Sequence, residues 1–463
     1  MNKKPNIVFF FTDDQRFDTI ATLGNKEIKT PNIDELVNGG TAFTQAHIPG
    51  GTVGAVCMPS RAMLHTSKTL FHTEDSGSEI PKEHVLLGEV LQKEGYRTFG
   101  TGKWHNGTKS YARSFTDGGE IYFGGMWDHW NVPAYSFDPE GKYDKTRKVI
   151  NNWAYDNKIS TQHCDHINLG KHSSELFSEL ATDWVHNYDS DEPFFMYISY
   201  MAPHDPRTMP DEFLDMYDTE TISLPKNFRE EHVFEYGIKD MRDEILEKYP
   251  RTEKAVKKHI AEYYGMITHL DNELGKVINE LKKSGKYEDT IIILAGDNGL
   301  ALGQHGLMGK QSCYEHSVRV PLIFAGPGIP KNEKRDTYAY LLDIYPTICD
   351  LIGVDIPETV EGISLVPAIT DESIKARDTL YLVYGDLVRA VKNERYKLIE
   401  YRTKDLKRTQ LFDIVDDTCE INDLYGQEKY NATVLELRKE LEKYRDEWDE
   451  LNHPIGNRFW ENY

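Results

Sequence analysis

Short apolar runs alternate with amphipathic segments along most of the chain. The nearly continuous run Asn6–Thr12 is typical of a strand that is buried on both faces of a parallel sheet. Similar runs predict further strands at Tyr96–Thr101, Phe194–Tyr200, Thr290–Ala295 and Val320–Phe324. Apolar positions at three- and four-residue spacing predict helices at Ile33–Asn38, from Cys57 onward, and at Leu86–Glu94, Ser173–Tyr188, Glu253–Lys283 and Leu342–Ile352. This alternation predicts an α/β fold with a large, mostly parallel (mixed) sheet sandwiched by helices.

Two regions depart from this alternation. The segment from Trp104 to about Lys171 is rich in Trp, Tyr, Asp and His, which suits either an active-site lid or the aromatic packing of an irregular loop. After about Leu365, short runs with tight turns predict a small antiparallel sheet, with strands at Thr379–Tyr384, Leu387–Lys392, Tyr396–Tyr401 and Gln410–Phe412. We therefore expect an α/β domain over residues 1–365, with an insertion at about 104–171, and a C-terminal α+β subdomain over residues 366–463.

The last predicted helix carries one apolar stripe. Its members recur at three- and four-residue spacing: Val434, Leu437, Leu441, Tyr444, Trp448 and Leu451. Such a stripe is typical of a helix face that docks on a sheet. The sequence therefore predicts that this helix covers the C-terminal sheet.

Charged side chains follow four of the predicted strands, at the point where each strand ends. The strands run into Asp13-Asp14, Lys103-Trp104-His105, His204-Asp205 and Asp297-Asn298. In an open α/β sheet, ligands bind outside the carboxyl ends of the strands. Each cluster alone fits a solvated loop, but four clusters in the same position predict one shared site.

The acidic pairs supply oxygen ligands. Asp13, Asp14, Asp297 and Asn298 offer three carboxylates and one amide. Oxygen-only ligands select a hard cation such as Ca²⁺ or Mg²⁺, whereas zinc prefers histidine or cysteine. The sequence predicts a single divalent ion, which would also relieve the repulsion between the carboxylates. The alternative for Asp13-Asp14 is a turn followed by a helix cap.

Cys57 opens a predicted helix, and Arg61 follows on the same helix face because residues four apart lie together. A helix N-terminus favours an anion, so we expect the pKa of the Cys57 thiol to be lowered. The alternative is a buried thiol beside a surface arginine. We expect several basic side chains around the ion: Arg61, Lys103, His105, His204 and Lys310. A metal ion with several cationic groups beside it is typical of a site that binds a sulfuryl or phosphoryl group.

Composition excludes several classes of function. The 463 residues are 39% hydrophobic and 28% charged, and the net charge of −22 argues against a nucleic-acid partner. The five cysteines contain no Cys-x-x-Cys pair. Their spacing therefore fits neither a disulfide framework nor a zinc knuckle. The run Ile7–Phe11 is too short for a signal segment, and no run reaches the length of a membrane span. We expect no membrane partner, and a cytoplasmic protein unless a leader has been removed, in which case it is periplasmic or secreted.

Cys57-Met58-Pro59-Ser60-Arg61 resembles the Cys-x-Pro-Ser-Arg signature of the type I (formylglycine-dependent) sulfatases, within the alkaline phosphatase superfamily. The resemblance covers most of the chain, because further motifs match in family order: Pro5-Asn6-Ile7-Val8 to Asp13-Asp14, Gly102-Lys103-Trp104-His105, Ala202-Pro203-His204, Ala295-Gly296-Asp297-Asn298-Gly299 and Asp343-Ile344-Tyr345-Pro346-Thr347. One departure lies after the arginine, where the family usually has Leu-Thr-Gly and this chain has Leu64-His65-Thr66-Ser67.

The resemblance implies roles for these residues. Cys57 would be converted to formylglycine (3-oxoalanine) by a formylglycine-generating enzyme or an anaerobic sulfatase-maturating enzyme. One Ca²⁺ would then be held by the formylglycine with Asp13, Asp14, Asp297 and Asn298. Arg61 would steady the hydrate of the aldehyde, which is the nucleophile, while Lys103 and Lys310 bind sulfate oxygens. His105 and His204 would handle protons: His105 as the base that releases sulfate, and His204 with Lys310 as the acid for the departing alcohol.

The substrate prediction uses the insertion. Aromatic faces stack on sugar rings and carboxylates accept hydrogen bonds from hydroxyls, so the stretch Trp127–Tyr143 favours a sulfated saccharide derived from a polysaccharide over an aryl sulfate or choline sulfate. The predicted substrate-binding residues are Lys103, His204, Lys310, Trp127, Asp128 and His129. Two alternatives remain: a phosphonate or phosphate ester hydrolase of the same superfamily, and a non-catalytic binder of sulfated glycans.

Overall fold

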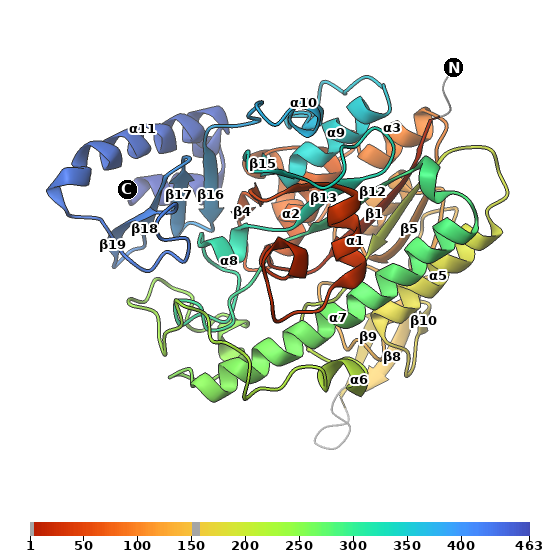
Figure 1. Cartoon of the computed structure of the whole chain (residues 1–463), viewed down its shortest axis with the longest axis horizontal. Coiled ribbons are helices and arrows are strands. Elements are labelled where there is room, and N and C mark those ends of the chain that lie inside the picture. The colour runs from red at the N-terminus through yellow and green to blue at the C-terminus, as the bar shows by residue number, and fades with distance from the viewer. Residues whose placement is uncertain (1–3, 151–157) are drawn as a thin grey trace.

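The large sheet forms the centre of the computed structural model, which describes residues 4–150 and 158–463 (Figure 1). Within these residues, eight strands pair in the order β14-β2-β13-β12-β1-β11-β5-β6. Their bounds are β1 (Asn6–Thr12), β2 (Gly40–Phe43), β5 (Arg97–Lys103), β6 (Asp117–Tyr122), β11 (Phe194–Ser199), β12 (Thr290–Gly296), β13 (Leu322–Ala325) and β14 (Glu333–Arg335). The strands β12, β1, β11, β5 and β6 run parallel, and β13 runs antiparallel to both β12 and β2. The predicted mostly parallel, mixed sheet is confirmed.

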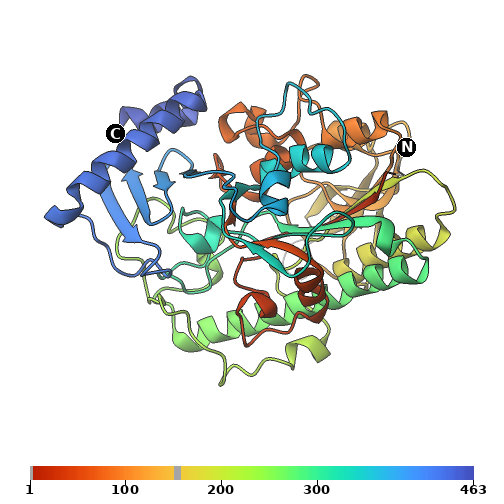
Figure 2. The same cartoon turned by 45° about the horizontal axis from the view of Figure 1, so that its top comes forward.

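Side chains of β1 alternate between the two faces of the sheet and so define two core layers. Ile7, Phe9 and Phe11 belong to one buried cluster, and Val8 and Phe10 belong to the other. The first cluster is covered by α2 (Cys57–Thr66), α3 (Leu87–Lys93) and α9 (Ile344–Leu351), and the second by α1 (Pro31–Gly39), α5 (Ser173–Asn187) and α7 (Glu253–Lys283). Figure 2 shows these two helical layers on either side of the sheet. All the predicted helices of this region are present.

The insertion is more regular than its composition suggests. Its strand β6 extends the main sheet parallel to β5, so the alternation continues past Trp104 instead of breaking there. The rest of the insertion holds α4 (Thr108–Ser114) and short antiparallel pairs made by β7 (Pro133–Ala134) with β10 (His166–Ile167) and by β8 (Thr146–Ile150) with β9 (Ile159–His163). Residues 151–157 of the predicted insertion, like residues 1–3 of the predicted first domain, lie outside the described residues.

The C-terminal sheet is antiparallel, as predicted. It contains β16 (Leu380–Tyr384), β17 (Val388–Lys392), β18 (Tyr396–Arg402) and β19 (Lys407–Asp413), and β4 (Gly50–Gly51) joins its edge in parallel with β16. The other short elements are β3 (Ala46–His47), β15 (Ala339–Tyr340), α6 (Asp211–Leu214), α8 (Glu315–Val318) and α10 (Val366–Thr370). The domain boundary at residues 365/366 stays a prediction.

The helix α11 (Asn431–Glu447) lies over this sheet (Figure 1) and buries Val434, Leu437 and Leu441 against it. The prediction for Leu451 was wrong, because this side chain is 47% exposed. The helix ends at Glu447, and Asp449 takes a left-handed conformation (φ 49°) that breaks the periodicity before Leu451. A further helix, α12 (Pro454–Glu461), follows. None of the helices in residues 4–150 and 158–463 combines the length and the apolarity that a membrane crossing needs.

Candidate active site

The carboxyl ends of β1 and β12 bring the two acidic pairs together. Thr12 and Gly296 are partners in the ladder, so the residues that follow them leave the sheet at the same level. The backbone N–H of Asp14 donates to Oδ1 of Asp297 at 2.9 Å, and the amide of Asn298 donates to Oδ1 of Asp14 at 2.6 Å. The predicted convergence of strand ends on one edge is therefore what the structure shows.

Cys57 begins α2 and is buried beside this edge, with 2% of its surface exposed. Its Sγ lies 3.5 Å from Nδ1 of His105 and 3.7 Å from Nζ of Lys103. The prediction of a lowered thiol pKa was wrong. Burial raises the pKa of Cys57 and outweighs the lowering by Lys103 and Lys310. The thiol is therefore not an activated thiolate.

Arg61 is fully buried one helical turn after Cys57 and binds the strand ends. Its Nε and Nη2 contact Oδ2 of Asp297 at 3.0 and 2.9 Å, and its Nη1 donates to Oγ of Ser199 at 2.6 Å and to the backbone oxygen of Lys103 at 3.1 Å. The alternative of a surface arginine is thereby wrong. Arg61 ties the ends of β12, β11 and β5 to the start of α2.

Lys103 and Lys310 each pair with one carboxylate. Nζ of Lys103 donates to Oδ2 of Asp13, and Nζ of Lys310 donates to Oδ1 of Asp14 at 2.6 Å. Burial opposes ionisation of Asp13, but Lys103, His204 and Arg61 hold the pKa of Asp13 well below its usual range. Together with Arg61, the two lysines match the three carboxylates one for one, so the cluster is close to neutral.

The acidic cluster fits a hard cation. Asp13, Cys57 and Asp297 each place one possible ligand atom within 4.8 Å of the others. Oδ1 of Asp13 and Oδ1 of Asn298 are buried without a hydrogen-bond partner, which is costly unless something binds them. Burial, and then the neighbouring Asp13, raise the pKa of Asp297, and a positive ion would relieve both effects. These oxygen donors suit Ca²⁺ or Mg²⁺.

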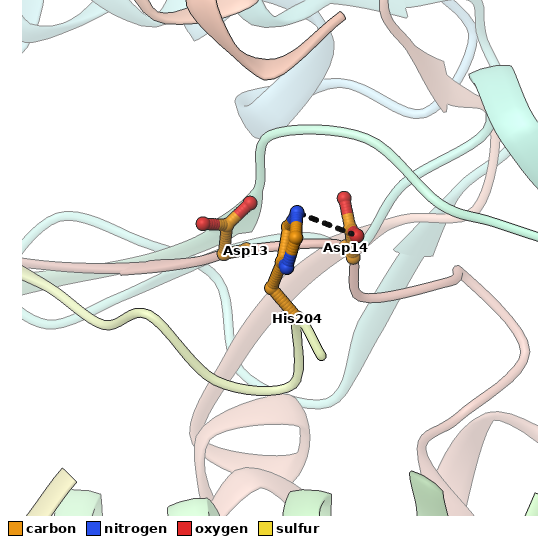
Figure 3. A group of neighbouring side chains, drawn as sticks. All are labelled: Asp13, Asp14 and His204. Carbon is orange, nitrogen blue, oxygen red and sulfur yellow. Dashed lines mark ion pairs between the residues drawn. The ribbon is translucent and has the colours of Figure 1, made fainter. Parts of the chain in front are cut away.

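The two histidines contact different groups of the cluster, His105 the Cys57 side chain and His204 the carboxylate of Asp14. Burial, and then Lys103 and Arg61, lower the pKa of His105 well below its usual value, so its imidazole is neutral at neutral pH. His204 lies beside the acidic pair (Figure 3), with Nε2 3.6 Å from Oδ2 of Asp14. Its Nδ1 donates to the backbone oxygen of Asp205 at 2.8 Å, which turns Nε2 toward Asp14. One neutral and one carboxylate-paired imidazole suit two different proton transfers.

A cavity of about 280 Å³ opens over Cys57. Its lining includes His105, His204 and Lys310 among the predicted residues. The remaining side chains that line it were not predicted from the sequence: Ala55, Met126, Met241, Arg242, Asp243 and Gln311. These come from irregular loops with no periodicity, although Met126 directly precedes the predicted Trp127.

The other predicted substrate residues lie outside this cavity. Trp127 is half-buried against the core, and Asp128 is exposed and accepts a hydrogen bond from the backbone of Trp130 at 3.0 Å. His129 is fully buried. Its Nε2 donates to the backbone oxygen of His204 at 3.0 Å, and its Nδ1 contacts Oγ of Ser173 at 2.7 Å. His129 is placed to position His204 and has no surface with which to touch a substrate.

Comparison with known proteins places the chain in a family. A family model described as Sulfatase matches residues 5–354, and one described as N-sulphoglucosamine sulphohydrolase, C-terminal, matches residues 303–447. A sulfatase from Formosa agariphila is 29% identical over 96% of this chain and 88% of its own length. An N-acetylglucosamine-6-O-sulfatase from Bacteroides thetaiotaomicron is 24% identical over 96% of this chain and 87% of its own length.

A solved structure shows the same fold at lower sequence identity. It holds a protein in complex with its substrate D-glucosamine-2-N,6-O-disulfate, and it superposes with a TM-score of 0.77 at 21% identity. The match covers 98% of this chain and 99% of that one. Because the Sulfatase family model spans most of the sequence, the chain belongs to the sulfatase family of sulfuric ester hydrolases.

Proposed function

We propose that the protein hydrolyses a sulfate ester on a sulfated saccharide derived from a polysaccharide, with formylglycine at position 57 as the source of the nucleophile. The observation that carries this proposal is the placement of Cys57. Its side chain lies at a cavity shared with His105, His204 and Lys310, and within 3.7 Å of Lys103. A side chain at position 57 therefore lies next to basic residues and next to histidines that can transfer protons.

Because burial raises the pKa of the Cys57 thiol, the nucleophile that we propose is the hydrate of formylglycine and not a thiolate. A buried, protonated thiol is a poor nucleophile, whereas the hydrate of an aldehyde at this position carries two hydroxyls. As one hydroxyl attacks sulfur, its proton passes to the carboxylate of Asp297, which lies beside position 57, and the bond from sulfur to the ester oxygen breaks. His204, with Lys310 beside it, gives a proton to the departing alcohol oxygen. This leaves a sulfate ester on residue 57.

Release of sulfate requires a base next to the second hydroxyl. Neutral His105, with Nδ1 3.5 Å from the Cys57 side chain, is placed to take that proton. The bond from the residue-57 carbon to the sulfate oxygen then breaks, sulfate leaves, and the aldehyde is regenerated for hydration by water. Lys103 and Lys310 are the cations that face the sulfate oxygens.

A calcium ion would be held by Asp13, Asp14, Asp297 and Asn298 together with the side chain at position 57. When bound, it would supply Lewis-acid polarisation of a sulfate oxygen. The orphaned oxygens of Asp13 and Asn298 support this assignment. Arg61 orients Asp297 through its two contacts with Oδ2, and its charge opposes the rise in the pKa of Asp297.

The saccharide part of the proposal is supported by the relatives. An N-acetylglucosamine-6-O-sulfatase and a structure with a glucosamine disulfate are both similar to this chain over almost its whole length. The cavity of about 280 Å³ has room for a sulfate group and part of one sugar ring. Met126 and Arg242 at its lining replace Trp127 and Asp128 as the side chains that we expect to contact the sugar.

The experiment is a substrate panel with protein whose aldehyde content has been checked by mass spectrometry. It compares sulfated mono- and oligosaccharides, an aryl sulfate, a phosphate diester and a phosphonate monoester, with the Cys57→Ala variant as control. We expect the highest kcat/KM on a sulfated saccharide. Faster hydrolysis of the phosphonate would instead identify a phosphonate hydrolase, and saccharide binding without sulfate release would identify a non-catalytic binder.

A further inference from the structure

A second cluster of metal-ligating side chains lies where α5 meets α7. The two helices run side by side (Figure 1), and His269 and Glu273 of α7 share one face because they are four residues apart. Glu175, in the first turn of α5, faces them. Nε2 of His269 lies 3.5 Å from Oε1 of Glu175 and 3.7 Å from Oε1 of Glu273. One possible ligand atom from each residue lies within 4.8 Å of the other two.

The imidazole of His269 is buried without a partner. Its side chain is 1% exposed, and neither Nδ1 nor Nε2 makes a hydrogen bond. Oε2 of Glu273 is likewise buried and unpartnered. Unpaired buried polar atoms are costly, so their grouping at one point indicates a ligand.

We propose that Glu175, His269 and Glu273 bind a divalent transition metal ion, with Zn²⁺ as the ion to test. One imidazole nitrogen with two carboxylate oxygens is a donor set typical of zinc. Ligand atoms at the usual zinc distances and tetrahedral angles lie about 3.4 Å apart, close to the 3.5 Å between Nε2 of His269 and Oε1 of Glu175. This set differs from the all-oxygen donors at the ends of β1 and β12, which suit a hard cation.

The surroundings allow an ion to enter and to be neutralised. The side chain of Glu175 is 28% exposed, which gives the cluster a route to solvent and leaves a fourth position for water. Lys276 is half exposed and pairs with Oε1 of Glu273 at 2.6 Å. A metal that takes the unpartnered Oε2 leaves this ion pair in place. The two carboxylates supply two negative charges opposite a dication, and Lys276 adds one positive charge at the rim of the group.

The proposed site lies behind the active site and would stabilise the segment that supports it. The His269 ring packs edge-on against His172, with centroids 4.6 Å apart, and His172 stacks on His129 at 5.2 Å. His129 in turn donates to the backbone oxygen of His204. None of the three proposed ligands lines the cavity over Cys57. The metal therefore has a structural role, in tying α5 to α7.

The test measures zinc binding directly. Metal-stripped protein is titrated with ZnCl₂ in a calorimeter, with excess Ca²⁺ present so that the active-site carboxylates are occupied, and zinc content is counted by elemental analysis. We expect the wild type to bind one more equivalent of zinc than His269→Gln. Zinc should raise the Tm of the wild type and leave that of His269→Gln unchanged. Co²⁺ should give a visible absorption band that is lost in the same variant.

Two glutamates of α5 provide a matched pair that does not depend on a buried substitution. Glu175→Gln removes a proposed ligand at a partly exposed position and should weaken zinc binding at least about tenfold. Glu179→Gln alters an exposed glutamate one turn further along the helix, where it pairs with Lys171, and should bind zinc like the wild type. Equal zinc stoichiometry in the wild type and His269→Gln would overturn the proposal, as would equal affinity in the two glutamine variants or no uptake by the wild type.

Discussion

Replacement of His105 by alanine should separate the two halves of the proposed reaction. Among the described residues, the polar side-chain atoms within hydrogen-bonding distance of Sγ of Cys57 are Nδ1 of His105 and Nζ of Lys103. Nζ of Lys103 donates to Oδ2 of Asp13, and a lysine ammonium has no lone pair with which to accept a proton. His105 is neutral because its pKa lies well below the usual value. His105→Ala should therefore leave sulfuryl transfer to position 57 largely intact and slow the release of sulfate.

The size of the effect follows from the loss of one general base. Such a group typically contributes about 10²–10⁴-fold, which corresponds to about 2.7–5.5 kcal/mol at 1.36 kcal/mol per tenfold. The pH profile has a defined sign. Because burial lowers the pKa of His105, its basic form persists as the pH falls from 8 to about 6, and the release step of the wild type should not weaken over that range.

Rapid mixing with a chromogenic aryl sulfate provides the assay. His105→Ala should show a burst of alcohol close to one equivalent of aldehyde-bearing enzyme, followed by a slow steady state. Intact mass spectrometry should find the mass of one sulfuryl group added to the protein. His204→Ala is the matched control, since it should slow departure of the alcohol and show no burst. A His105→Ala variant with no burst, no added mass and a steady-state rate close to that of the wild type would refute the assignment.

Three further predictions test the nucleophile, the ion and the packing of the C-terminal sheet. Cys57→Ala should abolish turnover at an unchanged Tm, and near-normal activity would exclude residue 57 as the nucleophile. A calcium chelator or Asp297→Ala should lower activity by orders of magnitude, and added Ca²⁺ should restore the activity of the wild type alone. Full activity in protein that elemental analysis shows to be metal-free would contradict the ion site. Arg389→Ala should cost about 3–5 kcal/mol in urea unfolding, because Arg389 and Glu450 form a fully buried ion pair at 2.6 Å. An equal loss in Arg445→Ala, which removes a partly exposed arginine paired with the exposed Asp446, would disprove this.

The sheet and its functional edge were predictable because both depend on local patterns. A continuous apolar run such as Asn6–Thr12 identifies a central strand, and the charged residue after each strand identifies the edge. The antiparallel end of the sheet was not predictable, because β2 begins directly after α1. There the backbone of Gly40 approaches Phe324 so closely that a Cβ would lie 2.1 Å from its carbonyl oxygen, a contact that sequence spacing does not show.

Errors at the site arise where tertiary burial outweighs a local rule. The position of Cys57 at a helix start predicts a lowered pKa, yet burial reverses the direction. His129 lies in a stretch whose composition suits sugar binding, yet it is fully buried and hydrogen-bonded to the backbone of His204. The long-range contacts that decide both cases join the insertion, α5 and the loop after β11, and the sequence gives no periodic signal for them.

Lys103 and Lys310 connect the acidic cluster to the cavity. Because the same two lysines lie near both, the site can hold a cation and an anion together. Each lysine contacts one carboxylate. Lys103 also lies 3.7 Å from Sγ of Cys57, which lines the cavity, and Lys310 lines the cavity itself. With three carboxylates matched by three basic side chains, a bound dication makes the cluster positive by two charges. A sulfate ester brings a negative charge to the same point, so binding of the ion and binding of the substrate reinforce each other. The overall charge of −22 would repel that substrate, and only this local reversal of sign lets an acidic protein bind it.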